Sequence, residues 1–524
     1  MGITFRQHRR RPFAGAVLVT VALLASACSD DDAGRASTAA STTESKTSST
    51  VPAIEPGAFT EAACAPDVVA TPPATVRCGT IEVPERHSEP DGHSVVLPVA
   101  IIEPEGGPTE HDPVVYLDGG PGGDGVTFAE VLSEMPLARA RRVVVIGQRG
   151  TPLAEPTFDC PEVEAAQLDA LDDELGEDAT AAARTALGEC FGRVTADDPD
   201  LATYDSATAA DDLEAARLAL GYDEWNLYGI SYGTRLGLEV LRRHPGAVRS
   251  AVLDSAYPPD VDAYATLVPG AERAFGELEA ACEEDPACAA AYPDLVDRVA
   301  SLYDQLEASP VDATGSDPRT GEPLTVRWDG DRMVRAAFNA LYAEAIIPLL
   351  PSLLQQFEQG QFDLATGTYL SFLITAGASM AEGLYQAVEC RERAPFADRA
   401  EIERQSEEEP AWLVSAALSE ASLDDCDVWR APPADPSVTD PVHSEVPTLI
   451  LAGRFDPITP PEWGRRAAAG LDRSYFRELP AAGHGVSLEG CAGEIVDAFL
   501  DDPTTEPDPG CVDQLGPPQW ILPE

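Results

Sequence analysis

The chain has 524 residues and a formal charge of −55 at pH 7, because 90 acidic residues outnumber 35 basic ones. A chain this acidic argues against nucleic acid and against an anionic membrane surface as binding partners. Hydrophobic residues make up 44% of the sequence, so most of it can fold around a large core.

The amino-terminal segment has the pattern of an export signal. Arginines at 6, 9, 10 and 11 precede a short apolar run over residues 13–24, which is short for a membrane span. The run ends in Leu24-Ala25-Ser26-Ala27-Cys28, small residues before a cysteine, as in a bacterial lipobox. We therefore expect residues 1–28 to be a lipoprotein-type signal, with Cys28 lipidated, although an ordinary cleavage site beside an incidental cysteine has the same pattern.

Polar, small residues over 29–57 leave almost nothing apolar to bury, which predicts a disordered tether between membrane and domain. The predicted location is extracytoplasmic, either lipid-anchored to the outer face of the cell membrane or secreted.

From residue 95 onward, apolar strands alternate with helices. The predicted strands are 95–102, 114–117, 143–146, 225–228, 248–253, 448–451 and 475–479. Helical patterns at 207–220 and 234–243 lie between them, and such alternation predicts a mostly parallel sheet with helices on both faces.

The alternation is interrupted once, between residues 254 and 448. The intervening stretch has mainly helical patterns, at 271–282, 295–306, 331–342, 347–358 and 410–418. It is too long for a crossover, so we expect an inserted helical cap over 258–443. The core would then be formed by 58–257 and 444–511, followed by a tail over 512–524.

Eleven cysteines agree with export, because removing Cys28 leaves an even number. Pairing of sequence neighbours suggests five disulfides, although spacing alone does not determine connectivity. These pairs are Cys64–Cys78, Cys160–Cys190, Cys282–Cys288, Cys390–Cys426 and Cys491–Cys511. No spacing resembles a zinc site, so no metal is expected.

The most informative motif is Gly229-Ile230-Ser231-Tyr232-Gly233, between a predicted strand and a predicted helix. A Gly-x-Ser-x-Gly in this context is the nucleophile elbow of a hydrolase, a turn so tight that glycine is needed on both sides. Ser231 is thus the candidate nucleophile.

A serine nucleophile needs a base and an acid that orients the base. Of seven histidines, His484 alone follows the last predicted strand, in Gly483-His484-Gly485, which makes it the candidate base. Asp456 follows the strand at 448–451 and is the preferred acid; Asp254, at the end of the preceding strand, is the alternative. Thr459 is interpreted either as a hydrogen-bond partner near Asp456 or as a helix cap.

An oxyanion hole requires two backbone N–H groups. The candidates are Tyr232, directly after the nucleophile, and Gly120 in the loop Asp118-Gly119-Gly120-Pro121-Gly122-Gly123. A phosphate-binding loop is disfavoured because no Lys-Ser/Thr pair follows the glycines.

These motifs, together with Gln148-Arg149-Gly150-Thr151 and Asp456-Pro457-Ile458-Thr459-Pro460, resemble the tripeptidyl and prolyl aminopeptidase family of α/β-hydrolases. The resemblance covers roughly residues 57–511 and is strongest with the secreted actinobacterial branch. It implies an α/β-hydrolase fold with a helical cap, a triad at Ser231, Asp456 and His484, and no cofactor. Asp118 and Gly147 differ from the histidine and aspartate that many relatives carry there.

The resemblance further implies removal of short peptides, tripeptides or similar, from free amino termini through an acyl-enzyme. Binding of the substrate ammonium requires a buried carboxylate. Glu382, Glu389 and Glu392 are candidates around Cys390, and Glu389 is preferred. A carboxylesterase with the same triad is the alternative enzyme, and a non-catalytic peptide-binding envelope lipoprotein is the alternative from another class. The expected partner is a peptide or protein substrate.

Overall fold

The computed structural model describes residues 54–107, 112–173, 177–418, 423–488, 490–508 and 510–523. These residues belong to one compact unit. Cys28, the predicted signal and nearly all of the predicted tether lie outside the described residues. Within the described part of the chain, no helix combines the length and the apolar character needed to cross a membrane.

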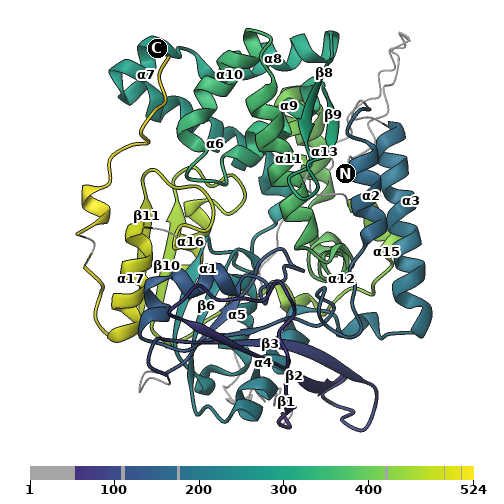
Figure 1. The fold of residues 1–524 in the computed structure, drawn as a ribbon, viewed down its shortest axis with the longest axis vertical. Coiled ribbons are helices and arrows are strands. Elements are labelled where there is room, and N and C mark those ends of the chain that lie inside the picture. Colours follow the sequence, from purple (N-terminus) through teal and green to yellow (C-terminus); the bar gives the residue numbers. More distant parts are fainter. Residues whose placement is uncertain are drawn as a thin grey trace, which may run out of the picture. The chain divides into compact units, whose positions relative to one another are not determined.

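The core is a nine-stranded sheet with the order β1-β2-β3-β5-β4-β6-β7-β10-β11 (Figure 1). From β5 to β11 all neighbours are parallel, whereas β1, β2 and β3 form an antiparallel edge that also joins β5 in antiparallel register. The bounds are β1 Ala58–Ala62, β2 Thr75–Pro84, β3 Ser94–Glu103, β4 Val114–Leu117, β5 Val143–Ile146, β6 Trp225–Ile230, β7 Val248–Asp254, β10 Thr448–Gly453 and β11 Ser474–Leu479. The predicted mostly parallel fold is confirmed.

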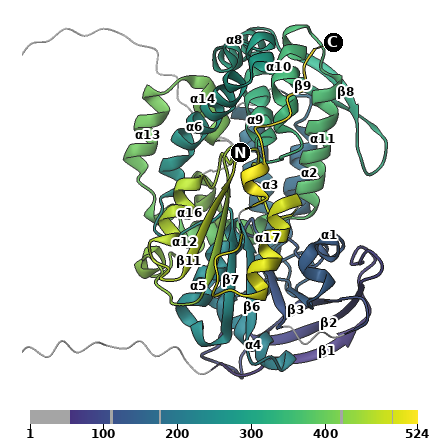
Figure 2. The ribbon, with the colours of Figure 1, turned by 90° about the vertical axis from the view of Figure 1, so that its left-hand side faces the viewer.

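Helices cover both faces of this sheet, as Figure 2 shows. Alternate residues of each central strand join different hydrophobic clusters; Leu227 packs on one face and Tyr228 on the other. One face is covered by α4 (Ser206–Leu220), α5 (Tyr232–Arg243) and α16 (Pro461–Ala468), and the opposite face by α1 (Ala129–Glu134) and α17 (Gly490–Asp501). Burial on both faces explains why the central strands are continuous apolar runs.

Between β7 and β10 the chain forms a separate set of helices and one hairpin, which we call the insertion. Its elements are α6 Ala263–Glu284, α7 Pro286–Ala291, α8 Leu295–Ala308, β8 Val311–Ser316, β9 Pro323–Trp328, α9 Gly330–Ala340, α10 Leu350–Glu358, α11 Asp363–Ala378, α12 Glu382–Glu392, α13 Arg399–Glu408, α14 Ala411–Leu418 and α15 Cys426–Trp429. Most of these helices share their own hydrophobic cluster, distinct from the two on the sheet.

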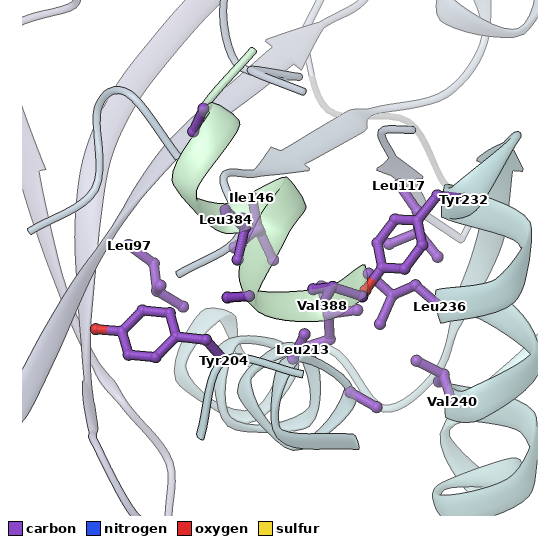
Figure 3. Packing of buried hydrophobic residues seen from close by; sticks show 14 of the residues in the cluster. Leu97, Leu117, Ile146, Tyr204, Leu213, Tyr232, Leu236, Val240, Leu384 and Val388 are labelled. Atoms are coloured by element: carbon purple, nitrogen blue, oxygen red, sulfur yellow. The ribbon is translucent and has the colours of Figure 1, made fainter. Parts of the chain in front are cut away.

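Two helices of the insertion, α12 and (through Trp429) α15, join a hydrophobic cluster of the sheet instead. Leu384 and Val388 of α12 are buried among Leu213 of α4, Leu236 of α5 and Ile146 of β5 (Figure 3). The helix α12 is therefore part of the core that supports the sheet, although it lies within the segment predicted as cap.

The sequence patterns missed two strand pairs. β2 reads Thr-Val-Arg-Cys-Gly-Thr-Ile-Glu-Val-Pro, in which charged residues and Gly79 interrupt the apolar run. β8 contains no residue larger than valine on its apolar side, and its exposure alternates along the strand. Both strands form through pairing with neighbours rather than through a strong local preference.

Each of the five disulfides joins a cysteine to the next cysteine along the described chain, as sequence spacing suggested. The loops they close span 6 to 36 residues. The prediction of these five pairs is confirmed.

Candidate active site

Ser231 occupies the turn between β6 and α5. Its backbone lies in the left-handed region, with φ 57°, an unfavourable conformation for a residue with a side chain. A Cβ at Gly229 would lie 2.5 Å from the carbonyl oxygen of Gly233, and a Cβ at Gly233 would lie 2.0 Å from that of Leu117. The two glycines are therefore required by the close approach of the backbone, as the elbow motif predicts.

His484 and Asp456 are in direct contact. The ring nitrogen Nδ1 of His484 lies 2.8 Å from Oδ2 of Asp456, and the Asp456 side chain is fully buried. The backbone N–H groups of Ile458 and Thr459 donate to the other carboxylate oxygen at 3.0 and 2.9 Å. The carboxylate is thus held at both oxygens, and the imidazole is oriented by it.

Burial disfavours the charged imidazolium, but the Asp456 carboxylate and its hydrogen bond outweigh this effect and raise the pKa of His484. Burial also opposes ionisation of Asp456, yet the pairing with His484 and the donors from Thr459 lower the pKa of Asp456. The pair therefore favours a protonated ring beside an ionised carboxylate, the state a serine hydrolase needs after proton transfer.

Thr459 contacts the pair rather than capping a helix. Its hydroxyl donates to Oδ2 of Asp456 at 2.7 Å and lies 3.1 Å from Nδ1 of His484. The helix that follows, α16, has Pro460 at its N-cap and no side-chain cap bond. The first interpretation of Thr459 is the one that the structure supports.

Asp254 does not contact the imidazole ring. Its carboxylate accepts the backbone N–H groups of Val486 and Ser487 at 3.0 and 2.7 Å, and also the Ser487 hydroxyl. Its main-chain carbonyl accepts the N–H of Ser231 at 3.0 Å. Asp254 therefore joins the loop that carries His484 to the turn that carries Ser231.

The neighbouring Ser255 completes this attachment. Its hydroxyl accepts the Gly485 N–H at 2.9 Å, so three consecutive N–H groups after His484 are bound by residues 254 and 255. Ser255 also has a left-handed backbone, with φ 58°. Neither Ser255 nor Ser487 belongs to a recognisable motif, and no sequence signal could have indicated them.

The glycine loop lies directly against the nucleophile. A Cβ at Gly119 would lie 3.1 Å from Cβ of Ser231, and Gly120 has φ 104°, a conformation that favours glycine. Tyr232 is the first residue of α5, so its N–H has no partner within the helix. These positions are compatible with the predicted oxyanion hole.

At Asp118 and Gly147, where the sequence differs from the pattern of many relatives, the local structure explains the residue present. Asp118 accepts the Tyr116 hydroxyl and the Gly119 N–H, both at 2.9 Å, and burial raises the pKa of Asp118. A Cβ at Gly147 would lie 2.5 Å from the Pro98 ring, so no side chain fits there. Asp118 thus stabilises the conformation of the glycine loop through these hydrogen bonds.

The three glutamates of α12 differ in their partners. Glu389 is buried; it pairs with Arg393 at 2.6 Å and accepts the Tyr264 hydroxyl at 2.8 Å. Glu392 is buried as well; it accepts Arg235 at 3.1 Å and the N–H and hydroxyl of Ser206. Glu382 accepts Gln386 at 2.9 Å, and burial raises the pKa of Glu382 to about 7.

The described residues contain no group of three or more histidine, cysteine, aspartate or glutamate side chains that could hold a metal ion.

Comparison with known proteins agrees with this geometry. Residues 112–277 match the family described as alpha/beta hydrolase fold, and residues 409–511 match the family described as TAP-like protein. The serine protease Hip1 of Mycobacterium tuberculosis strain H37Rv is 27% identical over 471 residues, which cover 83% of this chain and 87% of Hip1.

Two relatives from Streptomyces coelicolor match shorter stretches. A tripeptidyl aminopeptidase is 31% identical over 201 residues, 36% of this chain and 37% of the relative. A probable proline iminopeptidase is 31% identical over 143 residues, 27% of this chain and 41% of the relative.

The fold, the nucleophile elbow and the relatives together identify this chain as a serine hydrolase of the α/β-hydrolase class. Within that class, the carboxyl-terminal residues 409–511 match the TAP-like family, and the relatives include a tripeptidyl aminopeptidase and a probable proline iminopeptidase.

Proposed function

We propose that this enzyme is an exported aminopeptidase that releases short peptides from free amino termini. Ser231 attacks the scissile carbonyl while His484 removes its proton, and Asp456 holds the ring in the correct tautomer. The N–H groups of Tyr232 and Gly120 stabilise the oxyanion of the tetrahedral intermediate. His484 then protonates the leaving amine, and water hydrolyses the acyl-enzyme by the same route in reverse.

The observation that carries this proposal is the pair of Asp456 and His484 at 2.8 Å, together with Asp254, which binds both the loop after His484 and the backbone N–H of Ser231. The names of the relatives, a serine protease and a tripeptidyl aminopeptidase, favour peptides over simple esters.

The substrate ammonium requires a carboxylate near the site, and we propose Glu389 for this role. Because Glu389 already pairs with Arg393, the ammonium would replace or share that partner. Glu382 is the competing candidate, since it lies directly after Ala381, whose N–H donates to Gly122 of the glycine loop at 2.9 Å. An ammonium beside Glu382 would lower its raised pKa and keep it ionised.

We further propose that the enzyme is lipid-anchored through Cys28 outside the cytoplasm. Five disulfides in the described residues support an oxidising compartment. Mass spectrometry of the mature amino terminus tests the anchor: a diacylated Cys28 supports it, and an unmodified terminus contradicts it.

The activity is tested with three substrates: a tripeptide amide with a free amino terminus, its N-acetylated form and a simple acyl ester. Selective cleavage of the free peptide supports the proposal. Equal cleavage of both peptides indicates an endopeptidase, and turnover of the ester alone indicates a carboxylesterase. Ser231→Ala should abolish turnover without changing the melting temperature, whereas a non-catalytic binding protein would lose nothing.

In the same assay, Glu389→Gln and Glu382→Gln identify the ammonium site. The variant at the correct position should raise KM for the free peptide at least about tenfold, because a buried charge-assisted bond contributes roughly 1.5–3 kcal/mol. It should leave turnover of the ester unchanged. Equal, small effects from both variants would contradict an ammonium site on α12.

A further inference from the structure

The insertion contains an open cavity of about 820 Å³ between α9, α10 and α11. This volume lies within the range of about 300–1,000 Å³ that is typical of ligand sites. An apolar cavity of about 150 Å³ already holds a benzene-sized group, so this one has room for several such groups.

The cavity wall is mostly apolar. Aliphatic and aromatic side chains from all three helices line it, among them Met333, Leu350, Leu354, Phe357, Leu364 and Phe372. Leu364 and Phe372 of α11 are 49% and 42% exposed, so part of the apolar lining is in contact with solvent. The interior therefore favours an apolar guest over water.

One wall of the cavity reaches the histidine loop. Beyond the end of α9, Ala343 lines the cavity, and the preceding residue Tyr342 accepts the His484 N–H at 2.8 Å through its carbonyl. The Tyr342 and His484 rings are 5.0 Å apart. A Cβ at Gly483 would lie 2.1 Å from the carbonyl oxygen of Leu341, so this part of the insertion rests directly on the loop.

Another part of the wall reaches the glycine loop. Ser379, just beyond α11, lines the cavity, and its carbonyl accepts the Asp124 N–H at 2.9 Å. Met380 forms a backbone bridge with Gly123, and the Ala381 N–H donates to Gly122. These two parts of the wall therefore end on the two loops that flank Ser231.

We propose that this cavity binds bulky apolar side chains of the peptide substrate close to the scissile bond. The inference rests on the proposed peptidase function and adds the substrate class to it. Each methylene that leaves water for the cavity favours binding by about 0.8 kcal/mol, or roughly fourfold in affinity. Peptides with leucine-like side chains should thus be preferred over those with small polar ones.

The test compares Leu-Leu-Leu amide with Ser-Ser-Ser amide on wild-type enzyme and on a variant with a filled cavity. Ala340→Phe places a ring in the cavity from α9; Ala308→Phe, on the exposed end of α8, is the matched control. We expect kcat/KM for the leucine peptide to fall at least tenfold in Ala340→Phe and less than twofold in Ala308→Phe. The serine peptide should change less than twofold in both.

Ser371→Phe, which fills the cavity from α11, provides a second variant in case Ala340→Phe lowers the melting temperature. Equal effects on the two peptides, or no effect from either variant, would overturn the proposal. A preference for the serine peptide in the wild type would also overturn it.

A binding measurement separates this inference from the catalytic proposal. Calorimetry on the Ser231→Ala protein should show the leucine peptide binding at least tenfold more tightly than the serine peptide, and Ala340→Phe should remove the difference. If no peptide is cleaved but this difference persists, the proposed function fails and takes the substrate assignment with it, and the cavity is then only a binding site for apolar peptides. If peptides are cleaved but do not differ in binding, the cavity assignment fails alone. Binding of dodecanoate in place of either peptide would overturn the peptide assignment and indicate a site for acyl chains.

Discussion

Buried carboxylates have different binding partners at the carboxyl edge of the sheet and in the helical insertion. At the sheet edge, Asp254 and Asp456 are bound mainly by backbone N–H groups, hydroxyls and one histidine. In the insertion, Glu389 and Glu392 each pair with an arginine, in addition to the hydroxyl of Tyr264 for Glu389 and the N–H and hydroxyl of Ser206 for Glu392. The first arrangement fixes loops relative to one another, whereas the second fixes helices.

We infer that the carboxylates at the sheet edge position the catalytic residues, whereas those in the insertion stabilise the fold. Backbone donors bind a carboxylate only when the loop has one particular conformation, so their bonds define where Ser231 and His484 lie. Arginine side chains are long and reach their partners from several positions, so those pairs tolerate small shifts. Substitutions at the sheet edge should change catalysis, and substitutions in the insertion should change stability or selectivity.

The largest effect is expected for Asp456→Asn. An amide cannot hold the imidazole in the required tautomer, and an equivalent change in a serine protease triad lowers kcat about 10⁴-fold. Steady-state kinetics measure this loss, with Asp304→Asn on the exposed face of α8 as the control. A decrease below about tenfold would show that Asp456 is not the orienting acid.

The pH dependence of kcat/KM gives a second test of the role of Asp456. His484 must be neutral to act as a base, and Asp456 raises the pKa of His484. The acidic limb of kcat/KM should therefore lie above the ordinary histidine value of about 6.5 in the wild type. In Asp456→Asn the residual activity should rise at lower pH, because the charge that raised the pKa is absent.

Glu392→Ala should mainly reduce stability. It leaves Arg235 buried without its carboxylate, and loss of one partner of a buried pair costs about 3–5 kcal/mol. Thermal or urea unfolding measures the loss, and Glu403→Ala on the exposed side of α13 is the control. A stable protein with a large loss of kcat would contradict the division between the two regions.

Asp254→Asn should lower kcat about 10²-fold, the effect of misplacing a catalytic group by about 1 Å. The amide nitrogen cannot accept the N–H group of Val486 or Ser487, so the loop that carries His484 shifts. Because the Asp254 charge also helps to raise the pKa of His484, the acidic limb of the pH profile should move to lower pH, but less than in Asp456→Asn. A displacement like that of Asp456→Asn would instead make Asp254 part of the proton relay.

The smallest effect is expected for Thr459→Val, which removes one hydroxyl bond to Asp456. One hydrogen bond to a charged group contributes about 1.5–3 kcal/mol. Because the two backbone donors to Asp456 remain, only part of this stabilisation is lost, and kcat should fall roughly 5- to 20-fold. Steady-state assays at the pH optimum measure this change in kcat. No change would show that the backbone donors alone hold the carboxylate.

Much of the fold and the candidate triad could be predicted because their signals are local. The buried parallel strands are continuous apolar runs, and the elbow glycines are required by contacts within a few residues. Asp456 and His484 follow predicted strands, so the topology alone suggests that they meet, and the structure places them in contact.

Other features depend on contacts between distant parts of the chain. The attachment of residues 485–487 to Asp254 and Ser255 joins loops about 230 residues apart and uses residue types without a motif. The pairing of Glu389 with Arg393 is an i,i+4 contact, but the hydrogen bond from Tyr264 that accompanies it joins residues 125 positions apart. The packing of α12 with α4, α5 and β5 likewise joins distant parts of the chain.

The disulfide pattern has a consequence for biogenesis. In each pair, the first cysteine bonds to the next cysteine of the described chain, so if the chain enters an oxidising compartment amino end first, each pair can close before the next cysteine of the described chain arrives. The loops closed are short, which keeps the entropic cost of each closure small. Pairing of this kind reduces the need for an isomerase that exchanges wrong bonds.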